Sequence, residues 1–143
     1  MKQSIEEIVT MKTLACENPQ ANCKVGAMDV LIRHIIIEMN GCHFDQLNDP
    51  KFLEDSMIQM TRIMRTDIKA KATYQFKPQG VTSMLIIGAS HISVHTWPEH
   101  QYADIDLVVC TTDFDMEELI AYLNERFGTE DVRYMEIQRG VFA

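Results

Sequence analysis

The chain has 143 residues, enough for one ordinary domain; 46% of them are apolar and 24% are charged. This balance excludes a disordered, collagen-like or coiled-coil chain. With 13 Lys and Arg against 21 Asp and Glu, the formal net charge is −8, which argues against binding to nucleic acid or anionic membranes. The apolar runs are far shorter than the ~20 residues of a membrane-spanning helix. No secretory signal is visible at the start, so we expect a cytoplasmic protein.

The N-terminal half predicts a short helix, a buried strand and a longer helix. A capping-box pattern at Ser4-Ile5-Glu6-Glu7 predicts a helix over 5–15. The β-branched run Ile35-Ile36-Ile37 predicts a buried strand over 30–39. Asp49-Pro50 starts a helix of about five turns, with proline at its first position. Its apolar face comprises Leu53, Met57, Met60, Met64 and Ile68.

Beyond this helix the apolar residues alternate with a period of two, which is typical of strands. We expect strands over 72–77, 81–87, 90–95 and 103–111, joined by turns at Pro78-Gln79-Gly80 and Trp97-Pro98-Glu99. Asp113 or Asp115 caps a last helix that ends at Gly128, and a strand over 131–138 follows. The four cysteines, at 16, 23, 42 and 110, have no C-x-x-C spacing, so we expect free thiols.

Successive strands joined by short turns predict an α+β fold over residues 1–143, a single domain with an antiparallel sheet and helices on one face. Two long helices can cover only one face of this sheet. The other face would then expose more apolar surface than soluble monomers usually do. We therefore expect a homodimer in which two sheets stack into a four-layer αββα sandwich.

The segment from Ser90 to Glu99 is unusually polar for a strand with apolar neighbours. His91 and His95 lie on the same face, but four strand residues separate them by about 13 Å, too far to share one metal ion. No metal is therefore expected. A serine hydrolase elbow, G-x-S-x-G, is not present either, because Ile92 occupies the place of the second glycine.

Residues 89–99 (ASHISVHTWPE) closely resemble the signature of prokaryotic S-adenosylmethionine decarboxylases, whose usual form is E-S-H-[IL]-[ST]-[IL]-H-T-W-P-E. Residues 76–83 (FKPQGVTS) resemble the F-x-P-x-G-V-S-G of that family, and residues 102–110 (YADIDLVVC) resemble its Y-A-A-[IV]-D-[IL]-F-T-C. Residues 136–140 (EIQRG) resemble a terminal E-x-x-R-G. The resemblance runs from near His34 to the end of the chain and leaves residues 1–33 as an unmatched N-terminal extension.

The resemblance implies a proenzyme that makes its own cofactor. The hydroxyl of Ser90 would attack the carbonyl carbon of Ala89, and β-elimination would then split the chain. Residues 1–89 become the β chain, and residues 90–143 become the α chain with an N-terminal pyruvoyl group formed from Ser90. His95 matches the processing base of the family, and Thr82 stands in the place of a serine that donates a hydrogen bond during processing.

For the decarboxylation itself, the resemblance implies that Cys110 donates the proton that replaces the lost carboxylate. Glu99 would bind the ribose hydroxyls of S-adenosylmethionine, and Phe76 would stack on its adenine. The product, decarboxylated S-adenosylmethionine, would feed spermidine biosynthesis. The family further implies a homodimer of processed αβ units, with each active site near the subunit boundary.

The chain departs from the family pattern close to the cleavage site. Ala89 replaces a glutamate, and Thr82-Ser83 replaces Ser-Gly. The acyl shift uses only the carbonyl of residue 89, so alanine does not prevent it. Two alternatives stay open: a pyruvoyl-dependent decarboxylase of another amino acid, such as ornithine or arginine, and an unprocessed, non-catalytic regulatory homologue. Glu99 and Phe76 favour S-adenosylmethionine, because a basic amino acid has neither ribose nor adenine.

Overall fold

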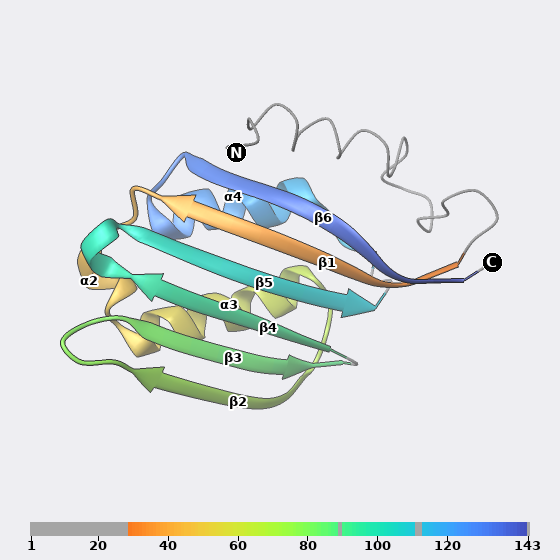
Figure 1. Ribbon diagram of the computed structural model, residues 1–143, viewed down its shortest axis with the longest axis horizontal. Helices are drawn as coiled ribbons and strands as arrows, with labels where there is room; N and C mark the ends of the chain where they lie inside the picture. The colour runs from red at the N-terminus through yellow and green to blue at the C-terminus, as the bar shows by residue number, and fades with distance from the viewer. Residues whose placement is uncertain (1–28, 89, 111–112, 143) are drawn as a thin grey trace, which may run out of the picture.

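The computed structural model describes residues 29–88, 90–110 and 113–142, so the expected helix over 5–15 lies outside the described residues. Figure 1 shows the elements in chain order. They are β1 (Asp29–Asn40), α2 (Phe44–Leu47), α3 (Pro50–Ile63), β2 (Ile68–Gln75), β3 (Val81–Ile87), β4 (Ser90–Trp97), the 3₁₀ helix η1 (Pro98–His100), β5 (Tyr102–Cys110), α4 (Met116–Phe127) and β6 (Asp131–Phe142).

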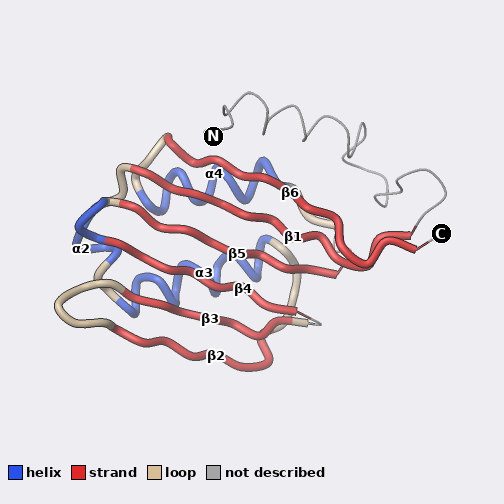
Figure 2. Tube along the Cα trace, in the orientation of Figure 1, coloured by secondary structure: helices blue, strands red, loops and turns tan. Residues whose placement is uncertain are grey.

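The six strands form one antiparallel sheet in the order β2-β3-β4-β5-β1-β6. Both long helices, α3 and α4, lie behind the sheet in the views of Figures 1 and 2, so they cover the same face. The predicted α+β fold, an antiparallel sheet with helices on one face, is confirmed. We call the uncovered side of the sheet the open face.

The core lies between the covered face and the helices, as the period-two pattern of the strands requires. Alternate residues of β1 and β5 are buried there, and α3 and α4 bring their apolar faces against them. The fully buried side chains include Ile35, Ile37, Met39, Leu53, Met57, Met60, Leu85, Ile105, Leu107, Leu119, Leu123 and Phe127. The expected apolar face of the first long helix is thus confirmed at Leu53, Met57 and Met60.

The prediction that the first long helix reaches Ile68 is wrong, because α3 ends at Ile63. Arg65 has a φ of 55°, a left-handed conformation that cannot continue an α-helix. Met64 is still buried, but Ile68 begins β2 and is 37% exposed. The apolar spacing of the helix therefore continued by coincidence into the next element.

Other element boundaries differ from the prediction by smaller amounts. The strand expected over 72–77 begins earlier, at Ile68, and the strand expected over 131–138 extends to Phe142. The one-turn helix α2 has no counterpart among the predicted elements. Asp115 caps α4 by accepting a hydrogen bond from the Glu117 amide at 2.8 Å, which settles the choice between Asp113 and Asp115.

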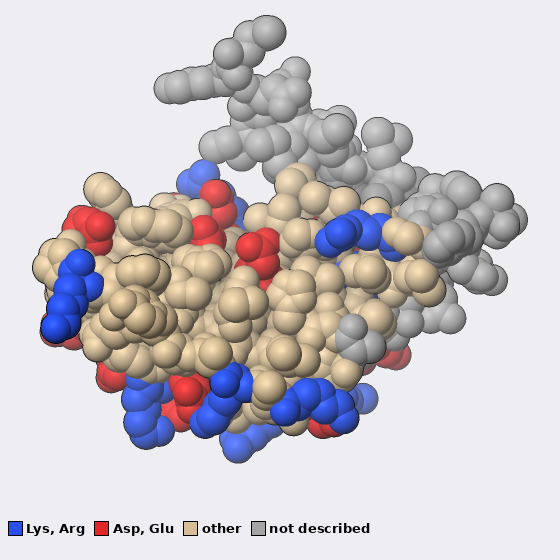
Figure 3. Space-filling view, turned by 60° about the horizontal axis from the view of Figure 1, so that its bottom comes forward, with Lys and Arg blue, Asp and Glu red and all other residues tan. Residues whose placement is uncertain are grey.

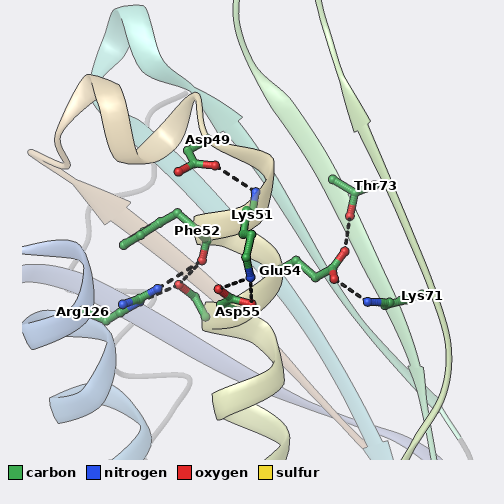
Figure 4. A network of polar contacts seen from close by, with 9 residues as sticks. Asp49, Lys51, Phe52, Glu54, Asp55, Lys71, Thr73 and Arg126 are labelled. Carbon is green, nitrogen blue, oxygen red and sulfur yellow. Dashed lines mark hydrogen bonds and ion pairs between the residues drawn. The ribbon is translucent and has the colours of Figure 1, made fainter.

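Polar contacts fix α3 between α4 and the edge strand β2 (Figure 4). Arg126 of α4 lies over the ring of Phe52, 4.1 Å from its centroid, and donates to Ser56 Oγ at 2.9 Å. On the other side of α3, Glu54 accepts from Lys71 Nζ at 2.5 Å. Asp49 caps the helix by accepting from the Lys51 amide at 2.9 Å. These contacts hold α3 against α4 and β2 on the covered face.

Candidate active site

The open face carries large apolar side chains that the described part of the chain leaves uncovered. Met84 is 42% exposed, Ile86 54% and Ile137 40%. The space-filling view in Figure 3 shows an area of uncharged side chains across the middle of the molecule, with Lys, Arg, Asp and Glu along its lower rim and further charged residues at the left and above it. The expected uncovered apolar face is therefore present.

Strand β4 divides its side chains between the two faces of the sheet as the alternation predicts. Ile92, Val94 and Thr96 are buried on the covered face. His95 and Trp97 alternate with them and therefore lie on the open face, where Trp97 is 40% exposed. Thr96 is satisfied in the core, since its hydroxyl donates to the Leu47 carbonyl at 2.7 Å.

The end of the sheet at which β4 finishes, which we call the histidine end, gathers four of the predicted site residues. Thr82, near the start of β3, is paired in register with His95. Their side chains are hydrogen-bonded, with Thr82 Oγ1 2.8 Å from His95 Nδ1. This contact follows from antiparallel pairing, because directly opposite residues place their side chains on the same face.

Phe76 lies between β2 and β3, and Glu99 lies in η1 between β4 and β5. Both connections are at this same end of the sheet (Figure 1). Phe76 follows β2, in a turn that is closed by a hydrogen bond from its amide to the Gly80 carbonyl at 2.8 Å. Its ring is 48% exposed and contacts Tyr74 edge to face, at 4.9 Å between centroids. Glu99 lies in η1 and is exposed. Both side chains are accessible to a ligand.

The opposite end of the sheet, which we call the serine end, holds Ser90 and Cys110. Ser90 is the first residue of β4, and Cys110 is the last residue of the neighbouring strand β5. The pairing of these strands includes His91 with Val108, so Cys110 lies two residues further toward the serine end. Both side chains are half-buried. Ala89, the residue before the expected cleavage point, lies outside the described residues.

Within one chain the structure does not bring Ser90 and His95 together. They are five residues apart on one strand, a separation of about 16 Å. Their side chains also lie on opposite faces of β4, because side chains alternate along a strand and the two positions differ by five, an odd number. One chain therefore presents two half-sites, with the serine and cysteine at one end of the sheet and the histidine, threonine, phenylalanine and glutamate at the other.

Asp104 is a residue of the histidine end that the sequence reasoning missed. It faces His95 on β4 and Glu38 on β1, each in direct register. Its atom Oδ1 is buried and has no hydrogen-bond partner among the described residues. Burial raises the pKa of Asp104, with His95 acting in the opposite direction and Asp106 and Glu38 adding to the rise. The short turn between β4 and β5 could have revealed this pairing, because it fixes the hairpin register.

The same part of the open face holds further polar contacts. The hydroxyl of Tyr102 lies 3.3 Å from Glu38 Oε1, and burial raises the pKa of Tyr102 to about 12. Asp106 is paired with His34 Nε2 at 3.0 Å. No three His, Cys, Asp or Glu side chains among the residues described here are placed to hold one metal ion. In the same part of the chain, no helix has the length and apolarity needed to cross a membrane.

Comparisons with known proteins identify the family. Residues 33–140 match the family model of S-adenosylmethionine decarboxylase. A protein of Clostridium botulinum (strain Langeland), named S-adenosylmethionine decarboxylase proenzyme, is 41% identical over 107 residues, which are 75% of this chain and 92% of the relative. A protein of the same name from Carboxydothermus hydrogenoformans is 39% identical over 114 residues, 80% of this chain and 90% of the relative.

The crystal structure of the adenosylmethionine decarboxylase from Aquifex aeolicus has the same fold, with a TM-score of 0.71 at 24% sequence identity. The likeness covers 80% of this chain and 94% of the Aquifex chain. The family match extends from β1 into β6, so it includes every strand that positions the two half-sites. The chain therefore belongs to the S-adenosylmethionine decarboxylase family.

Proposed function

We propose that this protein is a self-processing, pyruvoyl-dependent decarboxylase of S-adenosylmethionine that supplies decarboxylated S-adenosylmethionine for polyamine biosynthesis. The observation that carries the proposal is the hydrogen-bonded pair Thr82–His95, which lies at the same end of the sheet as the accessible Phe76 and Glu99. A proton-transferring imidazole beside an aromatic ring and a carboxylate suits a substrate with a base, a ribose and a reacting amino acid.

Self-cleavage needs only groups of the protein and one water. Ser90 Oγ attacks the carbonyl carbon of residue 89, the C–N bond breaks, and an ester with a free amine at Ser90 results. Removal of the Ser90 α-proton then expels the carboxylate of residue 89 and leaves a carbon–carbon double bond. One water replaces the nitrogen, which leaves as ammonia, so the products are a chain ending at Ala89 and a chain beginning with a pyruvoyl group.

Thr82 and His95 have different roles in this cleavage: Thr82 donates a hydrogen bond, and His95 accepts a proton. A hydroxyl has one proton, so Thr82 can donate to a developing oxyanion only if it accepts a hydrogen bond from His95. That requires the tautomer in which His95 Nδ1–H donates to Thr82 Oγ1. The lone pair of Nε2 is then free to take the Ser90 α-proton. The distance of 2.8 Å between Nδ1 and Oγ1 is compatible with this hydrogen bond.

We further propose that His95 acts on the Ser90 of a second chain. Within one chain the two residues are about 16 Å apart along β4. The open face offers the apolar surface that a second sheet would cover, since Met84, Ile86 and Ile137 are all exposed. A two-fold stacking of two sheets would bring the serine end of each chain to the histidine end of the other.

The residues at the serine end suit a pyruvoyl group made in place. Ser90 begins β4 at the limit of the sheet, so the new α-chain terminus would not break the strand pairing. When formed, the group supplies a carbonyl for the substrate amine and an electron sink for decarboxylation. Cys110 lies at the same end and would deliver a proton to the substrate carbon. Glu99 would accept hydrogen bonds from the ribose hydroxyls, and Phe76 would stack on adenine.

The test is the release of carbon dioxide from carboxyl-labelled S-adenosylmethionine by the purified protein. We expect turnover with this substrate and none with ornithine or arginine at the same concentration. The Ser90→Ala variant should remain one full-length chain and should release no carbon dioxide. Turnover of ornithine or arginine instead would contradict S-adenosylmethionine as the substrate. Cleavage of Ser90→Ala at the same bond would contradict the mechanism.

A further inference from the structure

A row of polar side chains crosses the open face through His95. Strand register places Glu38 of β1, Asp104 of β5, His95 of β4 and Thr82 of β3 next to one another in that order. Neighbouring side chains in such a row have Cβ atoms about 4.5–5.5 Å apart. His95 therefore has a hydroxyl on one side, at 2.8 Å from Nδ1, and a carboxylate on the other.

Asp104 lacks the partners that usually accompany a half-buried carboxylate. Its Oδ1 is shielded from solvent and accepts no hydrogen bond from the described residues. The groups that face it are Glu38 from β1, Asp106 and Tyr102 from its own strand, and His95 from β4. Glu38 and Asp106 repel its negative charge. His34 faces Asp106 and is paired with it, so His95 is the group on the adjacent strands that can balance Asp104.

We propose that Asp104 is a positioning residue for His95, stabilising the imidazolium that forms when His95 takes up a proton. This inference rests on the proposed self-cleavage. Thr82 fixes the ring through Nδ1, and Asp104 provides the opposite charge across the strand pair, where partial burial strengthens the attraction. The family pattern quoted above has alanine at this position, so the carboxylate is a feature of this chain and the backbone there accepts a residue without charge.

The experiment follows the rate of self-cleavage against pH, using freshly refolded full-length chains. Asp104→Asn removes the charge and keeps the shape, Asp104→Glu keeps the charge, and Glu38→Gln removes the neighbouring carboxylate one strand further from His95. Circular dichroism checks that each variant folds. Decarboxylation by the cleaved wild-type protein is measured alongside.

We expect Asp104→Asn to slow cleavage by about tenfold at the optimal pH, a modest share of what a positioned base contributes. Asp104→Glu should recover most of the rate. Glu38→Gln should keep the rate within about twofold, because a charge one strand further away is more strongly screened.

A wild-type rate in Asp104→Asn, or a loss of rate that Asp104→Glu does not restore, would overturn the inference and leave the proposed function intact. An equal loss of rate in Asp104→Asn and Glu38→Gln would also overturn it, since the effect would then come from the charge of the whole face. If the wild-type chain does not cleave at all, the proposed function fails, and this inference fails with it.

Discussion

Cys110 and Cys42 differ in their surroundings, which makes them a matched pair for testing proton delivery. Burial raises the pKa of Cys42 to about 11, and its side chain is 1% exposed within the core. Cys110 is half-buried at the serine end. Cys110→Ser should still self-cleave but should lose at least about tenfold in decarboxylation, because a hydroxyl is a much weaker acid than a thiol.

Cys42→Ala is the control for this prediction. It should keep its turnover number once folded, although the small cavity lowers its stability. Cleavage is followed by gel electrophoresis and turnover by carbon dioxide release. Wild-type turnover in Cys110→Ser would remove this cysteine from the mechanism.

Asp104 should lower the stability of the fold at neutral pH. Because burial raises its pKa, the folded chain holds this proton to a higher pH than the unfolded chain does. Stability is therefore lost as pH rises from the unfolded pKa through the raised folded pKa. The comparison uses the Ser90→Ala chain, which cannot cleave. At pH 7 this chain should have a higher Tm with Asp104→Asn than without it, and the difference in Tm should vanish near pH 3.5.

The result that would contradict this expectation is an equal or lower Tm for Asp104→Asn at pH 7. If Asp104 both lowers the Tm and accelerates cleavage, the fold is less stable at this position than it could be, for the benefit of function.

At the scale of the elements, α3 illustrates why the helix layer is stable. Met60 is fully buried against the sheet, whereas Arg62, two residues later, is exposed. Met60→Ala should reduce the free energy of unfolding by about 2–5 kcal/mol, because it leaves a cavity in the core. Arg62→Ala should change it by about 0.5 kcal/mol or less. Urea denaturation of both variants measures the difference, and equal effects would contradict the packing described for α3.

The elements also show which features a sequence can reveal. Local patterns were sufficient for β3, β4 and α4, where alternation or a cap such as Asp115 determines the element. The end of α3 was missed because the left-handed conformation of Arg65 carries no marked sequence signal, and Ile68 happened to continue the helical spacing. A strongly periodic pattern therefore predicted the type of the element better than its boundary.

The candidate site was predicted as a set of residues but not as an arrangement. The family motifs pointed to Ser90, His95 and Cys110, and the alternation in β4 put His91 and His95 on one face without indicating whether that face is covered. The grouping into two ends of the sheet depends on strand register and pairing order, which are long-range properties. Asp104 also went unnoticed, although the short turn between β4 and β5 fixes its register opposite His95 on the neighbouring strand.

At the scale of the whole molecule, the separation of the two half-sites predicts a dimer. Sedimentation of the purified protein should give about 33 kDa, twice the 16.5 kDa of one chain, because processed chains stay associated through the sheet. A stable, fully active species of 16.5 kDa at micromolar concentration would contradict the stacking of two sheets.

Mixed dimers test whether His95 acts across the subunit boundary. The His95→Ala chain keeps its serine, and the Ser90→Ala chain keeps its histidine. We expect neither chain to cleave alone, and the His95→Ala chain to cleave when the two are co-expressed with different tags. Persistence of both full-length chains in mixed dimers would contradict catalysis between subunits.

The most direct test of self-processing is the intact mass of the purified wild-type protein under denaturing conditions. We predict two chains, residues 1–89 and 90–143, whose masses add up to that of the intact chain plus one water and minus one ammonia. The second chain should have no free α-amine and should react with a carbonyl reagent. A single chain of 16.5 kDa, unchanged after prolonged incubation, would contradict the assignment of Ser90 as the source of a pyruvoyl group.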